Sequence, residues 1–301
     1  MKQTKKKIVW RVTFLAVGSI QVFGKPFAVG PYLGQTPPGP IAKVFAPGLI
    51  CDMQPHQWES AGQFSADGNT FCFYQCGYVY IIENTDQGWT APKRIESIPY
   101  KTGSVCMSPD ANIVYFVYSY DTSKRRYSLH RCMRTSQGWS LPEEIGPPIS
   151  SSGAYGGFSV AGDNSIFFTA GRGRFRVAPF LGNTWPEVIK IPVEKGNLKG
   201  CHPGIAPDES FMVFYSIRPG ALDGTETDLY LTLRQPDGTW TIPRNMGPRI
   251  NTGYYEWGAR ISPDKKYMFF TRSNGWGLNS SNDTSDIYWI ALKEYLPESY
   301  R

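Results

Sequence analysis

Short runs of alternating apolar and polar residues recur along this chain, and clusters of Pro, Gly, Asn and Asp separate them. The clearest runs are 78–82, 127–130, 228–231 and 286–290. Alternation that is rich in β-branched and aromatic residues predicts half-buried strands, and the intervening clusters predict turns. No stretch shows a sustained helical period. The pattern therefore predicts an all-β protein.

A second regularity is an aspartate within a turn signal, followed a few residues later by an apolar and aromatic run. It occurs five times, at Asp67, Asp110, Asp163, Asp208 and Asp264. Successive copies lie 43, 53, 45 and 56 residues apart. A period of this length indicates repeated copies of one supersecondary unit. We expect each aspartate to hydrogen-bond backbone amides of a tight turn between two strands.

A tryptophan followed closely by proline accompanies the repeat. The four examples are Trp89, Trp139, Trp185 and Trp240. One period then contains about four strands: one before the Asp turn, one after it, the alternating run, and the segment that follows the tryptophan. Four short antiparallel strands in about 40–50 residues are typical of a propeller blade. We expect the tryptophans to be structural, either covering a blade edge or filling the gap between adjacent blades.

The two ends of the repeat region indicate how the ring closes. The last blade ends after 286–291, with no tryptophan phrase behind it. Near the N-terminus, segment 40–48 is similar to 142–146 and 243–247, which follow tryptophan phrases. An N-terminal strand in the final blade would close the ring and remove open sheet edges. We therefore predict a five-bladed β-propeller of four-stranded antiparallel blades, closed by an N-terminal strand, as a single domain over 29–301.

Several of these phrases carry a family resemblance. Ser-Pro-Asp-Lys-Lys at 262–266, Asp-Ile-Tyr at 286–288, Trp-x-x-Pro at 240–243 and Ile-Asn-Thr at 250–252 resemble the TolB-like (WD40-like) β-propeller repeat family. The resemblance covers residues 35 to 295 and implies the propeller fold. It does not define a function, because that family contains binding and assembly modules as well as domains attached to enzymes. Asp163 departs from the pattern, since no Ser-Pro precedes it.

The formal net charge of +6 comes from one end of the chain. Residues 1–28 contain six basic residues and no acidic one, so the remainder is neutral and no nucleic-acid partner is expected. The mostly apolar segment 12–23 follows the first lysines. A basic start followed by a short apolar run predicts a signal peptide over 1–28, too short to span a bilayer. We therefore expect a periplasmic or secreted protein whose mature chain has no transmembrane segment; the alternative is a disordered basic tail on a cytosolic protein.

The six cysteines show no Cys-x-x-Cys spacing of the kind that binds metal. Their pairing cannot be chosen from the sequence, because six cysteines allow 15 pairings. We expect most of them to be buried thiols that pack as small hydrophobic residues. No cofactor and no metal site is predicted.

The innermost strand of each blade should line the central channel, with side chains alternating between the channel and the neighbouring blade. The residues three positions before the turn aspartates are all apolar, so this parity is expected to pack between blades: Phe64, Met107, Val160, Ile205 and Ile261. The opposite parity is expected to face the channel. Its members with chemical potential are Glu59, Gln63, Tyr155, His202, Glu256 and Arg260. A β-bulge in an inner strand would shift this parity.

Ring closure makes the blades of Glu59 and Glu256 neighbours, so their carboxylates are expected to share one rim of the channel, with Arg260 and Gln63 below and His202 and Tyr155 across the opening. Such a group suits a small polar ligand or a cation. The alternative is that both carboxylates hydrogen-bond neighbouring backbones, with Arg260 as their counter-charge. A second recognition site is expected on the long loop 273–285, where Trp276 could be an exposed anchor.

Two classes of function fit these features. The first is an exported binding scaffold for an envelope or extracellular protein, or for a small polar or saccharide ligand. It rests on the resemblance and on the absence of Gly-x-Ser-x-Gly and His-Glu-x-x-His motifs. The second is a carbohydrate-active enzyme at the channel mouth. Glu59 and Glu256 would then be an acid/base pair for glycoside hydrolysis. In a polysaccharide lyase, Tyr155 or His202 would take a proton while Arg260 neutralises a uronate. A structural role in an envelope complex is a third possibility.

Overall fold

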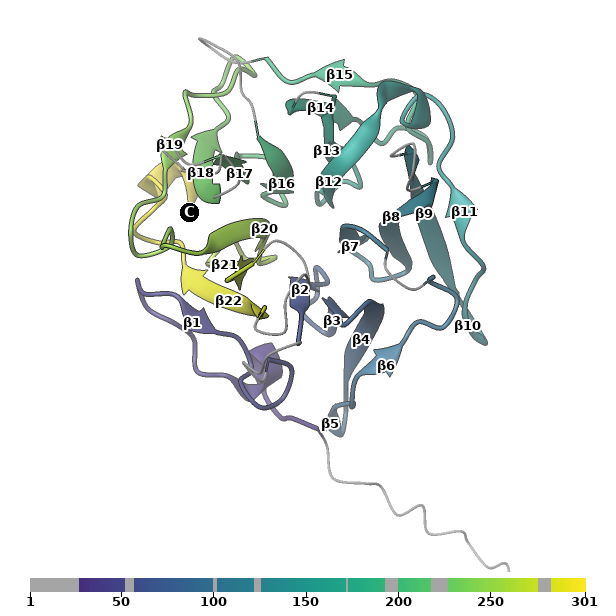
Figure 1. Cartoon of the computed structure of the whole chain (residues 1–301), viewed down its shortest axis with the longest axis vertical. Coiled ribbons are helices and arrows are strands. Elements are labelled where there is room, and N and C mark those ends of the chain that lie inside the picture. The colour runs from purple at the N-terminus through teal and green to yellow at the C-terminus, as the bar shows by residue number, and fades with distance from the viewer. Residues whose placement is uncertain are drawn as a thin grey trace, which may run out of the picture.

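The computed structural model describes residues 27–51, 57–99, 102–121, 126–171, 173–192, 200–217, 227–275 and 283–301. Its strands form five separate antiparallel sheets that are arranged radially around a central axis (Figure 1). This is the five-bladed β-propeller that the sequence predicts. The predicted signal peptide, apart from its last two residues, and Trp276 lie outside the described residues. No helix in the described ranges is long and apolar enough to cross a membrane.

The first three blades follow one another in sequence. Blade 1 contains β2 (Glu59–Phe64), β3 (Thr70–Gln75), β4 (Tyr78–Thr85) and β6 (Lys93–Arg94), with β5 (Gly88–Trp89) beside the end of β4. Blade 2 contains β7 (Val105–Met107), β8 (Ile113–Asp121), β9 (Arg126–Thr135) and β11 (Glu143–Glu144), with β10 (Gly138–Trp139) beside β9. Blade 3 contains β12 (Ala154–Val160), β13 (Ile166–Ala170), β14 (Arg174–Ala178) and β15 (Ile189–Lys190).

The last two blades complete the ring. Blade 4 contains β16 (Cys201–Ile205), β17 (Phe211–Ile217), β18 (Thr227–Leu233) and β19 (Arg244–Asn245). Blade 5 contains β20 (Tyr255–Ile261), β21 (Tyr267–Ser273), β22 (Ser285–Ala291) and the N-terminal β1 (Lys43–Val44). Short 3-10 helices lie outside the blades: η1 (Pro31–Gly34), η3 (Ser150–Ser152) and η4 (Glu298–Tyr300).

The N-terminal strand closes the ring, as predicted. In β1, Lys43 pairs with Trp289 of β22 in an antiparallel register. Phe45 continues the connection, because its N–H donates to the carbonyl of Ile287 at 2.8 Å. Its ring is fully buried and packs between blades 5 and 1, with Trp289 at 5.2 Å and Phe71 at 5.1 Å between ring centroids. Closure therefore combines backbone pairing with an aromatic core.

The core is divided among the interfaces between adjacent blades. Each interface holds its own cluster of buried apolar side chains, and each cluster combines residues of two neighbouring blades. The tryptophan phrases contribute to these clusters as expected. Trp240 of blade 4 packs edge-on against Phe167 of blade 3, and Trp185 of blade 3 packs edge-on against Tyr115 of blade 2. These tryptophans fill the gaps between blades.

The turn aspartates bind backbone amides, as their position in the repeat predicts. Asp110 accepts from the N–H of Asn112 at 3.1 Å and from the hydroxyl of Ser108 at 2.6 Å. The turns at Asp67 and Asp264 are built in the same way. The Asp163 and Asp208 turns have no serine two residues before the aspartate, and take the hydroxyl from the other side, from Ser165 and Ser210.

Four of the five inner strands contain a register shift. It falls between Ser60 and Gln63 in β2, between Ala154 and Phe158 in β12, between Cys201 and Gly204 in β16, and between Trp257 and Arg260 in β20. A bulge of this kind changes the face on which the preceding residues point. In blades 4 and 5 the bulge has a residue with positive φ, His202 at 49° and Gly258 at 66°.

Candidate ligand site in the central channel

Two cavities lie along the central channel, and Arg260 borders both. The larger has a volume of about 320 Å³. Its wall is formed by aromatic, hydroxyl-bearing and small residues of blades 1, 2, 4 and 5, and it includes Trp58, Ser60, Thr102, Ser104, His202 and Trp257. The smaller has a volume of about 110 Å³ and lies toward the Asp turns, where Gln63, Ser159 and Gly204 line it. No acidic side chain lines either cavity within the described part of the chain.

Arg260 extends from blade 5 to blade 2. Its Nη2 donates to the backbone carbonyl of Val105 at 2.8 Å and lies 3.4 Å from the hydroxyl of Ser104. Nη1 donates to the carbonyl of Ala259 at 3.0 Å. The side chain is 3% exposed. Among the described residues it has no carboxylate within 4.0 Å, and its Nε has no hydrogen-bond partner.

Burial lowers the pKa of the Arg260 guanidinium, while the nearby thiols of Cys106 and Cys72 act in the opposite direction. A guanidinium starts from so high a pKa that it keeps its proton in proteins. The channel therefore contains a buried cation whose charge is balanced by backbone carbonyl dipoles. Burying a charge without a counter-ion is costly.

His202 lies beside this cation in the larger cavity. Its imidazole packs against the rings of Tyr215 and Trp257, with centroids 5.3 and 5.5 Å away. Burial lowers the pKa of His202 to about 3, and the positive charge of Arg260 acts in the same direction. The ring is therefore neutral at physiological pH. Gly157 makes room for it, because a Cβ at Gly157 would lie 2.2 Å from Cγ of His202.

Part of the wall of the larger cavity is aromatic. The indoles of Trp58 and Trp257 have centroids 6.2 Å apart and planes inclined by 32°. Tyr74 and Tyr127 also line the cavity. Its wall therefore combines aromatic rings with hydroxyls and one positively charged group, Arg260. Pockets of this composition and of ~300–1,000 Å³ are typical of sites for small molecules.

Three of the residues predicted to face the channel do line it. Arg260 and His202 border the larger cavity, and Gln63 lines the smaller one. Gln63 also ties blades 1 and 2 together, because its Oε1 accepts from the N–H of Met107 at 2.9 Å. Tyr155 belongs to β12, but its side chain lies outside the described residues. Whether any of these residues binds a ligand stays a prediction.

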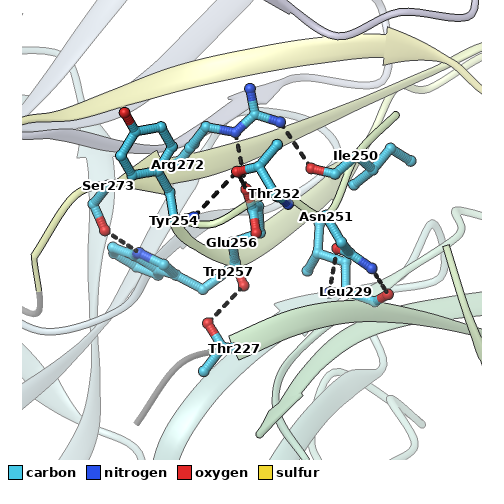
Figure 2. A network of polar contacts seen from close by, with 10 residues as sticks. All are labelled: Thr227, Leu229, Ile250, Asn251, Thr252, Tyr254, Glu256, Trp257, Arg272 and Ser273. Atoms are coloured by element: carbon cyan, nitrogen blue, oxygen red, sulfur yellow. Dashed lines mark hydrogen bonds and ion pairs between the residues drawn. The ribbon is translucent and has the colours of Figure 1, made fainter. Parts of the chain in front are cut away.

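Glu256 lies elsewhere than the channel-facing parity predicts. It is fully buried and absent from the cavity walls. Its Oε1 accepts from Nε of Arg272 at 2.9 Å and from the N–H and hydroxyl of Thr252 at 3.2 and 2.5 Å (Figure 2). Arg272 also donates to the carbonyl of Ile250 at 2.7 Å. Burial raises the pKa of Glu256, and Thr252 and Arg272 oppose that shift.

Glu59 repeats this arrangement in blade 1. It too is fully buried, and its Oε1 accepts from Nε2 of Gln75 at 3.0 Å. Gln75 stands opposite Glu59 in the strand register, as Arg272 stands opposite Glu256, and it donates to the carbonyl of Ile50 at 3.2 Å. The two glutamates therefore belong to a network that recurs in two blades. The alternative interpretation of the sequence holds in part: Glu256 accepts from a backbone N–H, that of Thr252, whereas the hydrogen bond described for Glu59 comes from the side chain of Gln75, and the counter-charge of Glu256 is Arg272 and not Arg260.

The bulges explain this difference. On the Asp-turn side of each bulge the predicted parity holds, so Gln63 and Arg260 reach the channel. On the other side the register shift reverses it, and Trp58, Ser60 and Trp257 face the cavity. The aromatic wall was therefore missed from the sequence. A usable signal was present, since a glycine inside a strand pattern indicates a bulge, and Gly62 and Gly258 occupy those positions.

One group in the described ranges has the composition of a metal site. Ligand atoms of Cys51, Glu59 and Asp286 lie within 4.8 Å of one another, and all three residues are buried. Cys51 accepts a hydrogen bond from the N–H of Ile287 at 3.3 Å. At the next interface Asn251 makes the same bridge, accepting from the N–H of Leu229 at 2.8 Å. The backbone N–H is thus accepted by a side-chain amide in one repeat and by a thiol in the other. We therefore assign the group a structural role at the blade interface.

Comparison with known proteins gives distant structural similarity alone. No protein-family model matches the sequence, and no curated protein matches it. Among solved structures, a protein from Agrobacterium tumefaciens assigned to TolB is similar with 13% identity and a TM-score of 0.48, over 74% of this chain and 72% of that one. A protein of unknown function from Bacteroides thetaiotaomicron VPI-5482 has 15% identity and a TM-score of 0.43, over 80% and 56%.

The tricorn protease is also similar, with 13% identity and a TM-score of 0.39, over 88% of this chain and 24% of that one. This chain thus spans about a quarter of the tricorn protease chain. At such low identity and TM-scores, these structures say nothing about the ligand, partner or activity of this protein. The strands of this chain themselves define a β-propeller, and its function has to be argued from its own residues.

Proposed function

We propose that this protein is an exported, non-catalytic scaffold that binds a small polar ligand in its central channel. The observation that carries the proposal is the larger cavity, where a buried arginine, a set of hydroxyls and an aromatic wall face one space of about 320 Å³. A rigid ring of blades holds these groups in place, so binding needs little reorganisation. The export part rests on the basic and apolar sequence of residues 1–28.

The chemistry of the cavity supports binding more than catalysis. A glycosidase needs two carboxyl groups beside the scissile bond, and Glu59 and Glu256 are both buried in hydrogen-bonded networks away from the cavity. A general base works best with a pKa near the operating pH, whereas the pKa of His202 is about 3. We therefore propose binding rather than catalysis, and the lyase hypothesis with Tyr155 as the base stays a prediction from the sequence, because the side chain of Tyr155 lies outside the described residues. A protein partner that binds through Trp276 and its loop remains a separate hypothesis from the sequence.

Binding can be tested by thermal-shift screening and calorimetry of the purified chain against neutral sugars, sugar acids, amino acids and other organic acids. We expect at least one class to bind without being converted. NMR spectra of the incubated ligands would show whether any product forms. Trp257→Ala should weaken that binding, because it removes part of the aromatic wall. Leu141→Ala is the matched control, since Leu141 is 82% exposed on a loop. Turnover of a ligand, or equal binding by Trp257→Ala, would contradict the proposal.

The other two parts need their own measurements. For export, a C-terminally tagged full chain should be found outside the cytoplasm, and lose its first 28 residues or so. Its retention in the cytoplasm with an intact N-terminus would overturn that part. For the protein partner, co-purification from envelope extracts should give one defined protein that is lost when loop 273–285 is deleted.

A further inference from the structure

We infer that the channel site is selective for small monocarboxylates, with Arg260 as the anion anchor. This inference rests on the proposed function and names the class of its ligand. It starts from the charge of the cavity wall. Within the described residues, Arg260 is the single charged group that lines either cavity, since His202 is neutral there and no acidic side chain contributes.

A single buried positive charge selects a single negative one. A monoanion neutralises Arg260, whereas a dianion such as hydrogen phosphate would bring a second charge into a site that has no second cation among the described residues. A neutral ligand would leave the guanidinium as it is. Because ion pairing and hydrogen bonding are stronger where water is excluded, the carboxylate of a ligand gains most by lying against this group.

The donors near Arg260 suit a carboxylate. A guanidinium has five N–H groups, and the structure gives those of Arg260 three acceptors, the carbonyls of Ala259 and Val105 and the hydroxyl of Ser104. Thr102 is 5% exposed, lines the same cavity, and its hydroxyl has no partner among the described residues. The hydroxyls of Ser60 and Ser104 belong to the same wall. These groups can donate to a carboxylate and accept from hydroxyls of the same ligand.

The rest of the cavity limits the shape and size of the ligand beyond its carboxylate. Trp58 and Trp257 present two indoles inclined by 32°, a surface against which the face of a ring can pack. A volume of about 320 Å³ corresponds to roughly ten water molecules at ~30 Å³ each. A ring carboxylate of monosaccharide size fits these limits. We therefore expect hydroxylated ring acids to bind better than flexible acids without an apolar face.

The test compares acids with their neutral parents on the purified full chain by isothermal titration calorimetry. D-glucuronate, D-galacturonate, D-glucose, D-galactose, benzoate and inorganic phosphate are the probes. A carboxylate held by a charged hydrogen bond should bind ~10- to 100-fold more tightly than its neutral parent. Arg260→Met should lose that preference by the same factor, and Arg260→Lys should retain part of it because the charge remains. Leu141→Ala should bind as the wild type does.

Folding of the variants is checked by circular dichroism and by their melting temperatures. Thr102→Val removes one hydroxyl and no charge. This second, milder variant should bind acids several-fold more weakly than the wild type does. Equal affinity for acids and neutral sugars, tighter binding of phosphate, or an unchanged acid preference in folded Arg260→Met would each overturn the anion anchor while leaving the binding scaffold intact. If none of the probes binds, the anion anchor falls; if the wider screen also finds no ligand, the proposed function falls with it.

Discussion

Nη2 of Arg260, in the inner strand of blade 5, donates to the backbone carbonyl of Val105, in the inner strand of blade 2, at 2.8 Å. These blades are not neighbours in the ring (Figure 1), so the side chain crosses the channel. It borders the larger cavity on one side and the smaller cavity on the other. The channel is thus divided by one guanidinium, which makes Arg260 the most informative residue to change.

Replacing Arg260 should stabilise the fold. Buried charged groups often cost more in desolvation than they gain, and apolar replacements of similar size have raised stability by ~1–4 kcal/mol in other proteins. Arg260 has no carboxylate partner within the described ranges, so we expect Arg260→Met to raise the free energy of unfolding by about 1–3 kcal/mol. Urea unfolding measures this. A loss of stability would mean that the hydrogen bonds to Val105 and Ala259 outweigh the desolvation of the cation.

Glu256 and Arg272 should behave in the opposite way, because each is the other's counter-charge. Arg272→Met leaves the carboxylate of Glu256 fully buried without its cation, and should cost about 3–5 kcal/mol of unfolding free energy at pH 7. The control is Arg249→Met, whose ion pair with Glu294 is half-exposed on both sides and is expected to contribute at most ~1 kcal/mol. Similar losses in both variants would be inconsistent with the burial of Glu256.

The same variant should show a characteristic pH dependence. Burial already raises the pKa of Glu256, and loss of Arg272 removes a group that lowers it. A raised carboxyl pKa means that the folded state takes up a proton before the unfolded state does, so folding is favoured as pH falls through that pKa. The penalty of Arg272→Met should therefore shrink between pH 7 and pH 5. Unfolding curves at several pH values would reveal a constant penalty if this account is wrong.

His202 should make the fold sensitive to mild acid. Its folded-state pKa is about 3, against an ordinary value of 6.5. Between these two pH values His202 is protonated in the unfolded chain and neutral in the folded chain. Stability from this group is complete above pH 6.5 and is lost as pH falls toward 3, by at most about 1.4 kcal/mol per pH unit. His202→Asn should flatten this slope between pH 7 and pH 5. Asparagine is the choice because it tolerates the φ of 49° at this position.

Ring closure should depend on Phe45 far more than on its exposed neighbour. Phe45 is fully buried between blades 5 and 1, and truncating a buried phenylalanine typically costs ~3–5 kcal/mol. Phe45→Ala should therefore lower the midpoint of urea unfolding strongly. Ile41→Ala, at a position that is 65% exposed, is the matched control and should change stability by less than about 0.5 kcal/mol. Equal effects would mean that the N-terminal strand does not hold the ring closed.

The blade count and the closing strand could be predicted because the repeat carries turn and strand signals in every copy. The part of the channel lining near the Asp turns could be predicted too, since Gln63 and Arg260 each lie four residues before a turn aspartate. The lining on the other side of the bulges could not be predicted by alternation alone, because a bulge reverses which side chains of the strand face the channel. Gly62, Gly157 and Gly258 lie within the bulges of three blades, whereas the bulge of blade 4 contains His202 and Pro203 and no glycine.

The reach of Arg260 across the ring had no signature in the sequence. Its acceptors are the carbonyls of Ala259 and Val105, and any residue type supplies a backbone carbonyl. The pairing of Glu256 with Arg272 is different, since opposite charges stood at facing positions of two predicted strands. Registering β20 against β21 would have found it. Side-chain pairs within a blade are therefore within reach of sequence reasoning, whereas contacts of side chains with backbone across the axis are not.

The two directions from which the Asp turns take their hydroxyl bear on how such proteins can be recognised. A search pattern that requires serine two residues before the aspartate finds three blades in this chain, at Asp67, Asp110 and Asp264. A pattern that accepts serine on either side also finds Asp163 and Asp208, because Ser165 and Ser210 close the same hydrogen bond. In diverged propellers, the narrower pattern can miss blades. A pattern based on the hydrogen bond between the serine hydroxyl and the aspartate, whichever residue comes first, can count them in full.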